Sequence, residues 1–167
     1  SCASGGGRFD PKGTTTRAQV VQILYNLAGG PKAAGTTPFT DLTQDWYKDA
    51  VLWAYQNGIV TGTSDTTFAP INNVTREQMT KMFYGYAEFM DYNTIAVADL
   101  SAFADGGSVS SWAQTMMGWA VANTLISGVQ EGNTTYLRPQ GNATRAEAAA
   151  ILHRFDQWRI NAVVTVK

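Results

Sequence analysis

The chain has 167 residues, and its 12 Lys and Arg against 13 Asp and Glu leave a net charge of −1. Because only 15% of its residues are charged, it lacks the basic stripe with which a nucleic-acid binder neutralises phosphates. A hydrophobic fraction of 44% argues against disorder, and no apolar run approaches the roughly 20 residues of a membrane span. One His and one Cys leave little for metal or nucleophile chemistry, so we expect no catalytic site, no metal and no cofactor.

Both ends of the chain differ in composition from its body. Residues 1–8 are mostly Gly, Ser and Ala, so we expect a flexible leader in which Cys2 has no intrachain disulfide partner. Residues 159–167 are expected to form a C-terminal tail, within which residues 162–166 alternate as a strand would.

Between these ends the sequence repeats itself. Residues 39–41 (Phe-Thr-Asp) recur as residues 103–105 (Phe-Ala-Asp), and residues 58–62 (Gly-Ile-Val-Thr-Gly) align with residues 124–128 (Thr-Leu-Ile-Ser-Gly). A third motif, Thr-Arg-x-Gln/Glu, occurs three times, beginning at Thr16, Thr75 and Thr144. Several matched positions in a fixed order indicate a repeat architecture.

The repeats define the expected organisation of the chain. Residues 9–30 match only the second half of a repeat, whereas residues 39–90 and 103–158 each hold a full one. Each full repeat is predicted to form helix, loop, helix. We therefore expect a mostly α fold, in which helix-loop-helix repeats surround a central helix bundle with pseudo-threefold symmetry.

The first helix of a repeat is indicated by tryptophans. Trp46 and Trp53 lie on one face of an amphipathic helix, which we expect to be capped by Asp45 and ended by Gly58. Trp53, further along the apolar face, is expected in the core with its equivalent Trp119.

The third repeat departs from this pattern at both ends of its first helix. Ser110 or Ser111 is the expected cap, and Thr124 takes the place of the terminating glycine, so we expect this helix to end differently. Residues 62–70 and 128–139 carry turn-forming residues without a helical period and are predicted to be loops.

The second helix of each repeat is predicted to open with a capping box. In this motif the Thr hydroxyl accepts from the third helical amide, and the Gln or Glu side chain accepts from the Thr amide. The three pairs are Thr16 with Gln19, Thr75 with Gln78, and Thr144 with Glu147. Apolar faces follow each pair and are expected to meet in one core.

An arginine follows each capping threonine: Arg17, Arg76 and Arg145. A cation at this position lies at the positive end of the helix dipole, which costs about 0.3–1 kcal/mol. This arginine could be a surface residue that has no binding role, or it could pair with a nearby carboxylate. Its repetition favours a third interpretation, in which the arginine and free helix amides converge on a bound anion.

Aromatic and polar residues lie near these arginines in the repeat. Trp46 and Trp112 follow the Phe-x-Asp motif and are either core residues or platforms on which the apolar face of a sugar ring stacks. The expected polar partners of the sugar hydroxyls are Asp41, Asp105 and the loop amides at Gly62 and Gly128.

Together, Phe-x-Asp, Trp, Gly-Ile-x-x-Gly and the threefold Thr-Arg-x-Gln/Glu resemble the S-layer homology repeat, over residues 9–156. The resemblance implies a pseudo-trimeric helical module at the bacterial cell surface, which anchors proteins to a secondary cell wall polysaccharide, often through a pyruvylated amino sugar. It also implies inter-repeat grooves where arginine takes the pyruvate carboxylate. The implied glycan-binding residues are Arg17, Arg76, Arg145, Trp46, Trp112, Gly62 and Gly128.

The chain departs from the family pattern because its first repeat has no Phe-x-Asp motif, tryptophan helix or glycine loop. At most two grooves are therefore expected to be complete, and another polypeptide or a second copy could supply the missing half. The alternative function is then a protein-interaction module without glycan binding. An enzyme is not expected, because the aspartates recur with the repeat instead of forming one unique pair.

Overall fold

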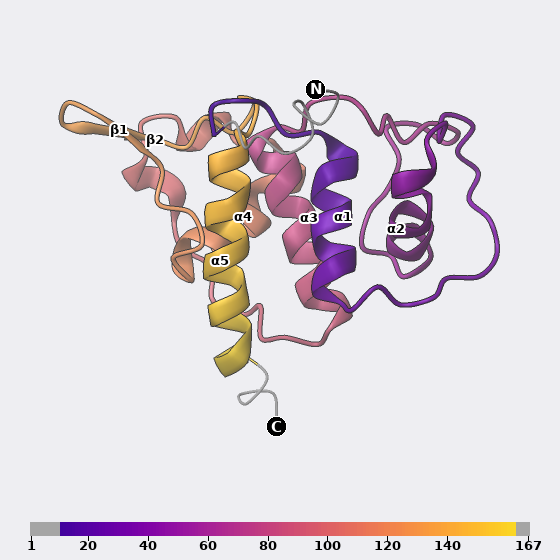
Figure 1. Cartoon of the computed structure of the whole chain (residues 1–167). Helices are drawn as coiled ribbons and strands as arrows, with labels where there is room; N and C mark the ends of the chain where they lie inside the picture. The colour runs from indigo at the N-terminus through magenta and orange to yellow at the C-terminus, as the bar shows by residue number, and fades with distance from the viewer. Residues whose placement is uncertain (1–10, 163–167) are drawn as a thin grey trace.

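The computed structural model describes residues 11–162, in which helices α1, α3 and α5 lie side by side and helices α2 and α4 lie beside them (Figure 1). Helices α1, α3 and α5 are the predicted second helices of the three repeats and begin at the same end of the molecule. Helix α2 packs against α1, and α4 packs against α3. The α-helices are α1 (Arg17–Leu27), α2 (Asp45–Gln56), α3 (Arg76–Phe89), α4 (Gln114–Ala122) and α5 (Arg145–Ala162).

The helix starts are held by the predicted capping boxes. Thr16 Oγ1 accepts from the Gln19 amide at 3.2 Å, and Gln19 Oε1 accepts from the Thr16 amide at 2.8 Å. Thr75 with Gln78, and Thr144 with Glu147, repeat this arrangement. The prediction of three capping boxes is confirmed.

Backbone hydrogen bonds join the three repeats into a ring at these helix starts. The Arg17 amide donates to Asn72 O at 3.0 Å, Arg76 to Gly141 O at 2.9 Å, and Arg145 to Gly13 O at 2.9 Å. Each repeat thus donates to the next, and the third donates back to the first. The second helical amides follow the same order, since residues 18, 77 and 146 donate to the carbonyls of residues 70, 139 and 11. The predicted pseudo-threefold, mostly α fold is confirmed.

The core lies between helices α1, α3 and α5. Phe83 on α3 and Phe155 on α5 are fully buried, with ring centroids 5.3 Å apart and the rings edge to face. Trp53 and Trp119 are 3% and 0% exposed, as predicted for core residues. Within residues 11–162, no helix is both long and apolar enough to cross a membrane.

The starts of the first helices differ from the sequence expectation. Helix α2 begins at Asp45 itself, with Gln44 as the N-cap residue, so the predicted cap is wrong by one position. In the third repeat Ser110 caps a 3-10 turn, η4 (Ser111–Ala113), and the α-helix begins only at Gln114. Trp112 therefore lies in a turn before the helix. Two further 3-10 turns precede it, η2 (Leu100–Ala102) and η3 (Gly106–Ser108).

The ends of the first helices are alike, contrary to expectation. Gly58 has φ +71°, and Thr124, which replaces it, adopts the same left-handed conformation with φ +55°. The preceding asparagines, Asn57 and Asn123, each donate their side-chain amide to a carbonyl four residues back at 2.8 Å. Thr124 thus accepts backbone strain so that this helix ends as its counterpart does.

The predicted loop at residues 128–139 contains a β-hairpin. Strands β1 (Val129–Glu131) and β2 (Thr134–Tyr136) pair antiparallel, with Gln130 opposite Thr135. The hairpin projects from the helical body (Figure 1), so it adds little to the core. Its two short strands give no sequence period long enough to predict.

We predict that Thr124→Gly stabilises the protein by about 0.5–1 kcal/mol. The left-handed conformation costs a non-glycine residue about 1–2 kcal/mol, and the flexibility of glycine in the unfolded chain offsets part of the gain. Chemical denaturation measures the difference. The matched control is Gly58→Thr, which places the same strain in the other repeat and should destabilise. A loss of stability in Thr124→Gly would contradict this account.

Candidate functional site: three grooves between the repeats

Groove A, a cavity of about 410 Å³, is built from all three repeats. The first repeat contributes Arg17 at the start of α1, and the third contributes Trp112. The second repeat contributes the loop 59–63 and the α3 residues Gln78 and Lys81. Among its lining residues are two cations and no carboxylate.

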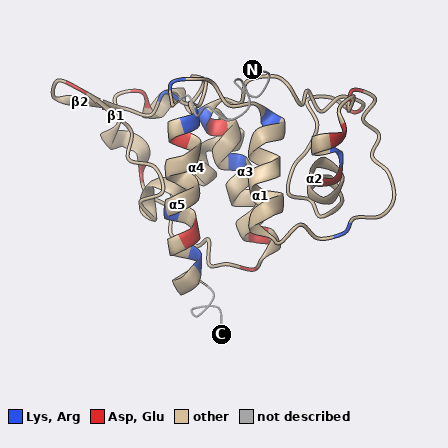
Figure 2. Ribbon diagram, in the orientation of Figure 1, with Lys and Arg blue, Asp and Glu red and all other residues tan. Residues whose placement is uncertain are grey.

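Arg17 is anchored in groove A by backbone carbonyls. Its Nε donates to Phe68 O at 2.8 Å and its Nη2 to Thr61 O at 3.0 Å, while the guanidinium lies 4.6 Å from the centroid of the Phe68 ring. Burial lowers the pKa of Arg17, and the charge of nearby Asp41 opposes that shift. An arginine remains charged in such a setting. Figure 2 shows Lys and Arg residues at the upper ends of α1 and α5.

Trp112 and Lys81 also line groove A. Trp112 is 46% exposed, which excludes the core role left open by the sequence. Lys81 Nζ lies 5.3 Å from the Trp112 ring centroid and donates to Thr61 Oγ1 at 3.3 Å. Groove A therefore presents an aromatic face beside two positive charges.

Groove B is the equivalent cavity between the second and third repeats and is smaller, about 100 Å³. It is lined by Arg76, by the loop 125–129, and by Glu147 and Arg154 of α5. Arg76 is already paired, because Glu147 Oε2 accepts from its Nε at 2.9 Å and its Nη2 at 2.8 Å. No tryptophan is among its lining residues in the described part of the chain.

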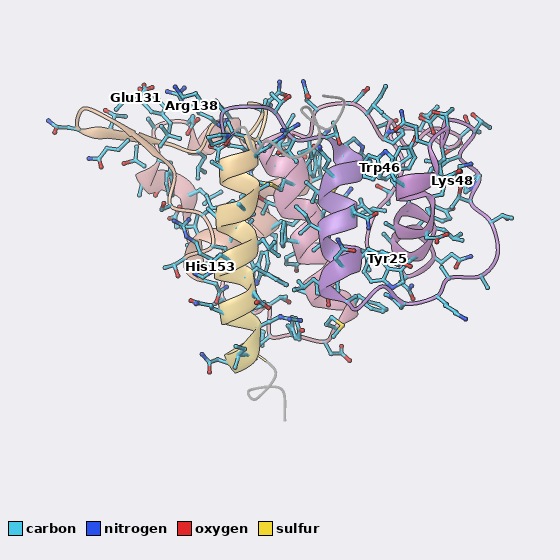
Figure 3. The ribbon with its side chains drawn as sticks, viewed as in Figure 1. Tyr25, Trp46, Lys48, Glu131, Arg138 and His153 are labelled. Atoms are coloured by element: carbon cyan, nitrogen blue, oxygen red, sulfur yellow. The ribbon has the colours of Figure 1, made fainter. Side chains whose placement is uncertain are left out.

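Groove C, about 320 Å³, combines Arg145 with Gln19 and Ile23 of α1 and with Trp46. Trp46 is 49% exposed, so it too is not a core residue (Figure 3). No glycine loop lines this groove within residues 11–162. The Nε of Arg145 is buried and has no hydrogen-bond partner among the described residues.

One rule relates the three grooves. Groove A takes its arginine from one repeat, its glycine loop and capping Gln from the next, and its tryptophan from the repeat after that, and the residues present in grooves B and C follow the same order. Within residues 11–162, groove B lacks a tryptophan and groove C lacks a glycine loop. Only groove A is complete in the described chain, where the sequence allowed two.

The helix amides do not form an anion site, which corrects the sequence expectation. The amides of Arg17, Arg76 and Arg145 each donate to a carbonyl of the adjacent repeat, as do those of the residues that follow them. The third amide of each helix donates to the capping threonine. An anion in these grooves therefore receives no hydrogen bond from these helix amides.

The Phe-x-Asp carboxylates fix backbone turns. Asp41 accepts from the amides of residues 68 and 69 at 2.9 and 2.8 Å, and Asp105 from those of residues 137 and 138 at 2.7 and 2.8 Å. These bonds hold Ala69 and Arg138 at φ +57° and +51°. Neither carboxylate lines grooves A, B or C, so their contact with a sugar stays a prediction.

The loop glycines are required by close packing. A Cβ on Gly62 would lie 2.5 Å from Ser64 O, and one on Gly128 would lie 2.9 Å from Tyr136 O. Gly128 also has φ +84°, which a side chain disfavours. Gly62 lines groove A and Gly128 lines groove B.

Sequence reasoning missed two groups in the site. Lys81 on α3 was counted neither as a site residue nor as part of the repeat, because its equivalents Gln22 and Ala150 are uncharged. Glu147 was assigned to capping alone, although it also binds Arg76, which is distant in the chain. Within residues 11–162, no group of three or more His, Cys, Asp or Glu could hold a metal ion.

Comparison with known proteins extends this description. The S-layer homology domain profile matches residues 38–80 and 102–149. The chain is 36% identical over 149 residues to a surface-layer 125 kDa protein of Lysinibacillus sphaericus, covering 89% of this chain and 12% of that protein. It is 32% identical to an endoglucanase of Bacillus sp. (91% of this chain, 16% of that protein) and 32% identical to the exoglucanase XynX of Acetivibrio thermocellus (87% and 13%).

We predict that Asp41→Ala lowers the free energy of unfolding by about 2–4 kcal/mol. It removes two charge-assisted hydrogen bonds and leaves two backbone amides without their acceptor. Thermal or chemical unfolding measures the loss. Asp65→Ala, at an exposed loop position, is the matched control and should be neutral. Equal stability of the two variants would refute the turn-fixing role.

Proposed function

The chain belongs to the S-layer homology domain family, and we propose that it anchors a surface protein by binding a secondary cell wall polysaccharide in groove A. The family is an anchoring module of cell-surface proteins and is not catalytic. The chain spans only 12% to 16% of the three relatives described above, so their enzymatic names describe much longer proteins.

Groove A carries this proposal through one observation: an exposed indole lies beside two cations in a single cavity. The apolar face of a sugar ring stacks on Trp112, because its C–H groups contact the π face. Arg17 and Lys81 then bind a negatively charged substituent, for which the family resemblance suggests the carboxylate of a ketal-linked pyruvate. Thr61 and the backbone at Gly62 supply hydroxyl partners at the rim.

The other candidate residues contribute to incomplete sites in this proposal. Within residues 11–162, groove B, with Arg76 and Gly128, lacks a tryptophan and groove C, with Arg145 and Trp46, lacks a glycine loop, so neither is proposed as the main glycan site. Asp41 and Asp105 act as positioning residues, since their turns set the loops that form the grooves.

A second candidate function, assembly with another chain, is favoured by the outer face of α5. Ala146, Ala149 and His153 are exposed there (Figure 3). The equivalents of Ala146 and Ala149 on α1 and α3, which pack against α2 and α4, are at most 4% exposed; these are Ala18, Val21, Glu77 and Thr80. A first-half repeat from another polypeptide would cover this face and supply partners for the buried Arg145 Nε.

Trp112→Ala is predicted to weaken polysaccharide binding at least 10-fold, because truncating a central aromatic anchor costs about 2 kcal/mol or more. The matched control is Trp46→Ala, since Trp46 has nearly the same exposure but lies in incomplete groove C. Isothermal titration calorimetry with purified cell wall polysaccharide measures both. Equal losses in the two variants would contradict the assignment of groove A.

The assembly candidate predicts a mass in solution above that of a single 18.1 kDa chain. Sedimentation equilibrium of the purified protein measures this mass. The purified protein is also mixed with a peptide of residues 37–62, which holds the first half of the second repeat. The mixture should give a 1:1 complex, and His153→Glu should weaken it. A monomer that does not bind the peptide would rule out assembly through α5.

A further inference from the structure

The third residue of each of the helices α1, α3 and α5 performs two tasks. Its Oε1 accepts from the amide of the capping threonine, at 2.8 Å for Gln19, 3.0 Å for Gln78 and 2.8 Å for Glu147. This bond fixes the side chain, and in each groove the same residue faces the arginine of the preceding repeat. The atom that remains free for the arginine is an oxygen in Glu and a nitrogen in Gln.

Groove B shows the effect of glutamate at this position. Glu147 Oε2 accepts from two nitrogens of Arg76, at 2.9 and 2.8 Å, and the two side chains are only 32% and 18% exposed. The pair is partly shielded from solvent, where charge-assisted hydrogen bonds are strong. Arg76 therefore has an internal carboxylate at the place where a ligand's carboxylate would bind.

Groove A shows the effect of glutamine. Arg17 donates to two neutral carbonyls and forms no salt bridge within residues 11–162. The free end of Gln78 is an N–H donor, and Lys81 adds an ammonium group to the same groove, one of whose donors already binds Thr61 Oγ1. Asp41, the carboxylate whose charge acts on Arg17, already binds the amides of residues 68 and 69. Groove A thus presents donors and positive charge without an acidic group.

We infer that the capping-box residue decides which groove takes an anion: Gln78 leaves groove A in need of an anionic acceptor, and Glu147 closes groove B to one. This inference rests on the proposed function and deepens it. It identifies the ligand of groove A as a glycan with a carboxylate or similar anionic substituent. It also assigns Gln78 and Glu147 as specificity-determining residues.

The test exchanges the two residues. Gln78→Glu installs in groove A the pair seen in groove B, and the fold tolerates it because Glu147 forms the same capping box. We expect Gln78→Glu to weaken binding of pyruvylated polysaccharide at least 10-fold. Binding of the same polymer after acid removal of its pyruvate should not change. Gln19→Glu in groove C is the matched control and should bind as the wild type does.

Glu147→Gln is the reciprocal substitution and removes the carboxylate from groove B. Calorimetry should then show a second, weaker binding event with pyruvylated polymer, because Arg76 is no longer paired. A single event as in the wild type would overturn the role of Glu147.

The outcomes separate this inference from the proposed function. Wild-type affinity in Gln78→Glu, together with loss of binding in Trp112→Ala, would overturn the role of Gln78 and leave groove A as the site. Wild-type affinity in both variants would overturn the proposed function itself. Equal affinity of the wild type for polymer with and without pyruvate would refute anion recognition.

Discussion

The ring of backbone hydrogen bonds at the starts of α1, α3 and α5 is the interaction on which the rest of the structure depends. It satisfies helix amides that would otherwise lack partners, and it uses carbonyls from the adjacent repeat to do so. Each helix start is therefore held against the loop of another repeat. The arginine at the first helical position of each is placed at an inter-repeat boundary as a direct result.

This arrangement makes every groove composite. Because three repeats each supply one wall, residues 11–162 complete groove A and leave grooves B and C each without one wall. The ring also uses the amides that a helix start could offer to an anion, so in our proposal the side chains recognise the charge. Small differences among these, such as Gln78 against Glu147, then distinguish grooves whose backbones are equivalent.

Much of the fold could be predicted from local sequence patterns. Capping boxes, amphipathic spacing and the three repeats need only neighbouring residues, and they gave the helices, the buried Trp53 and Trp119 and the pseudo-threefold symmetry. The prediction of free helix amides was wrong because it depends on contacts between residues that are distant in the sequence. The amides of Arg17 and Arg76 looked free because their acceptors, Asn72 and Gly141, belong to other repeats.

The same limit applies to the site. The arginines and tryptophans stood out by repetition, but their division among three grooves follows from the ring. The strain at Thr124 could not be foreseen either, since propensity opposes it and the common geometry of the helix end imposes it.

A crystal structure of the chain with a fragment of pyruvylated cell wall polysaccharide tests the central claim most directly. The account predicts one sugar stacked on Trp112, with its carboxylate between Arg17 and Lys81, and no anion bound at Arg76. A carboxylate bound at Arg76 while groove A is empty would contradict it.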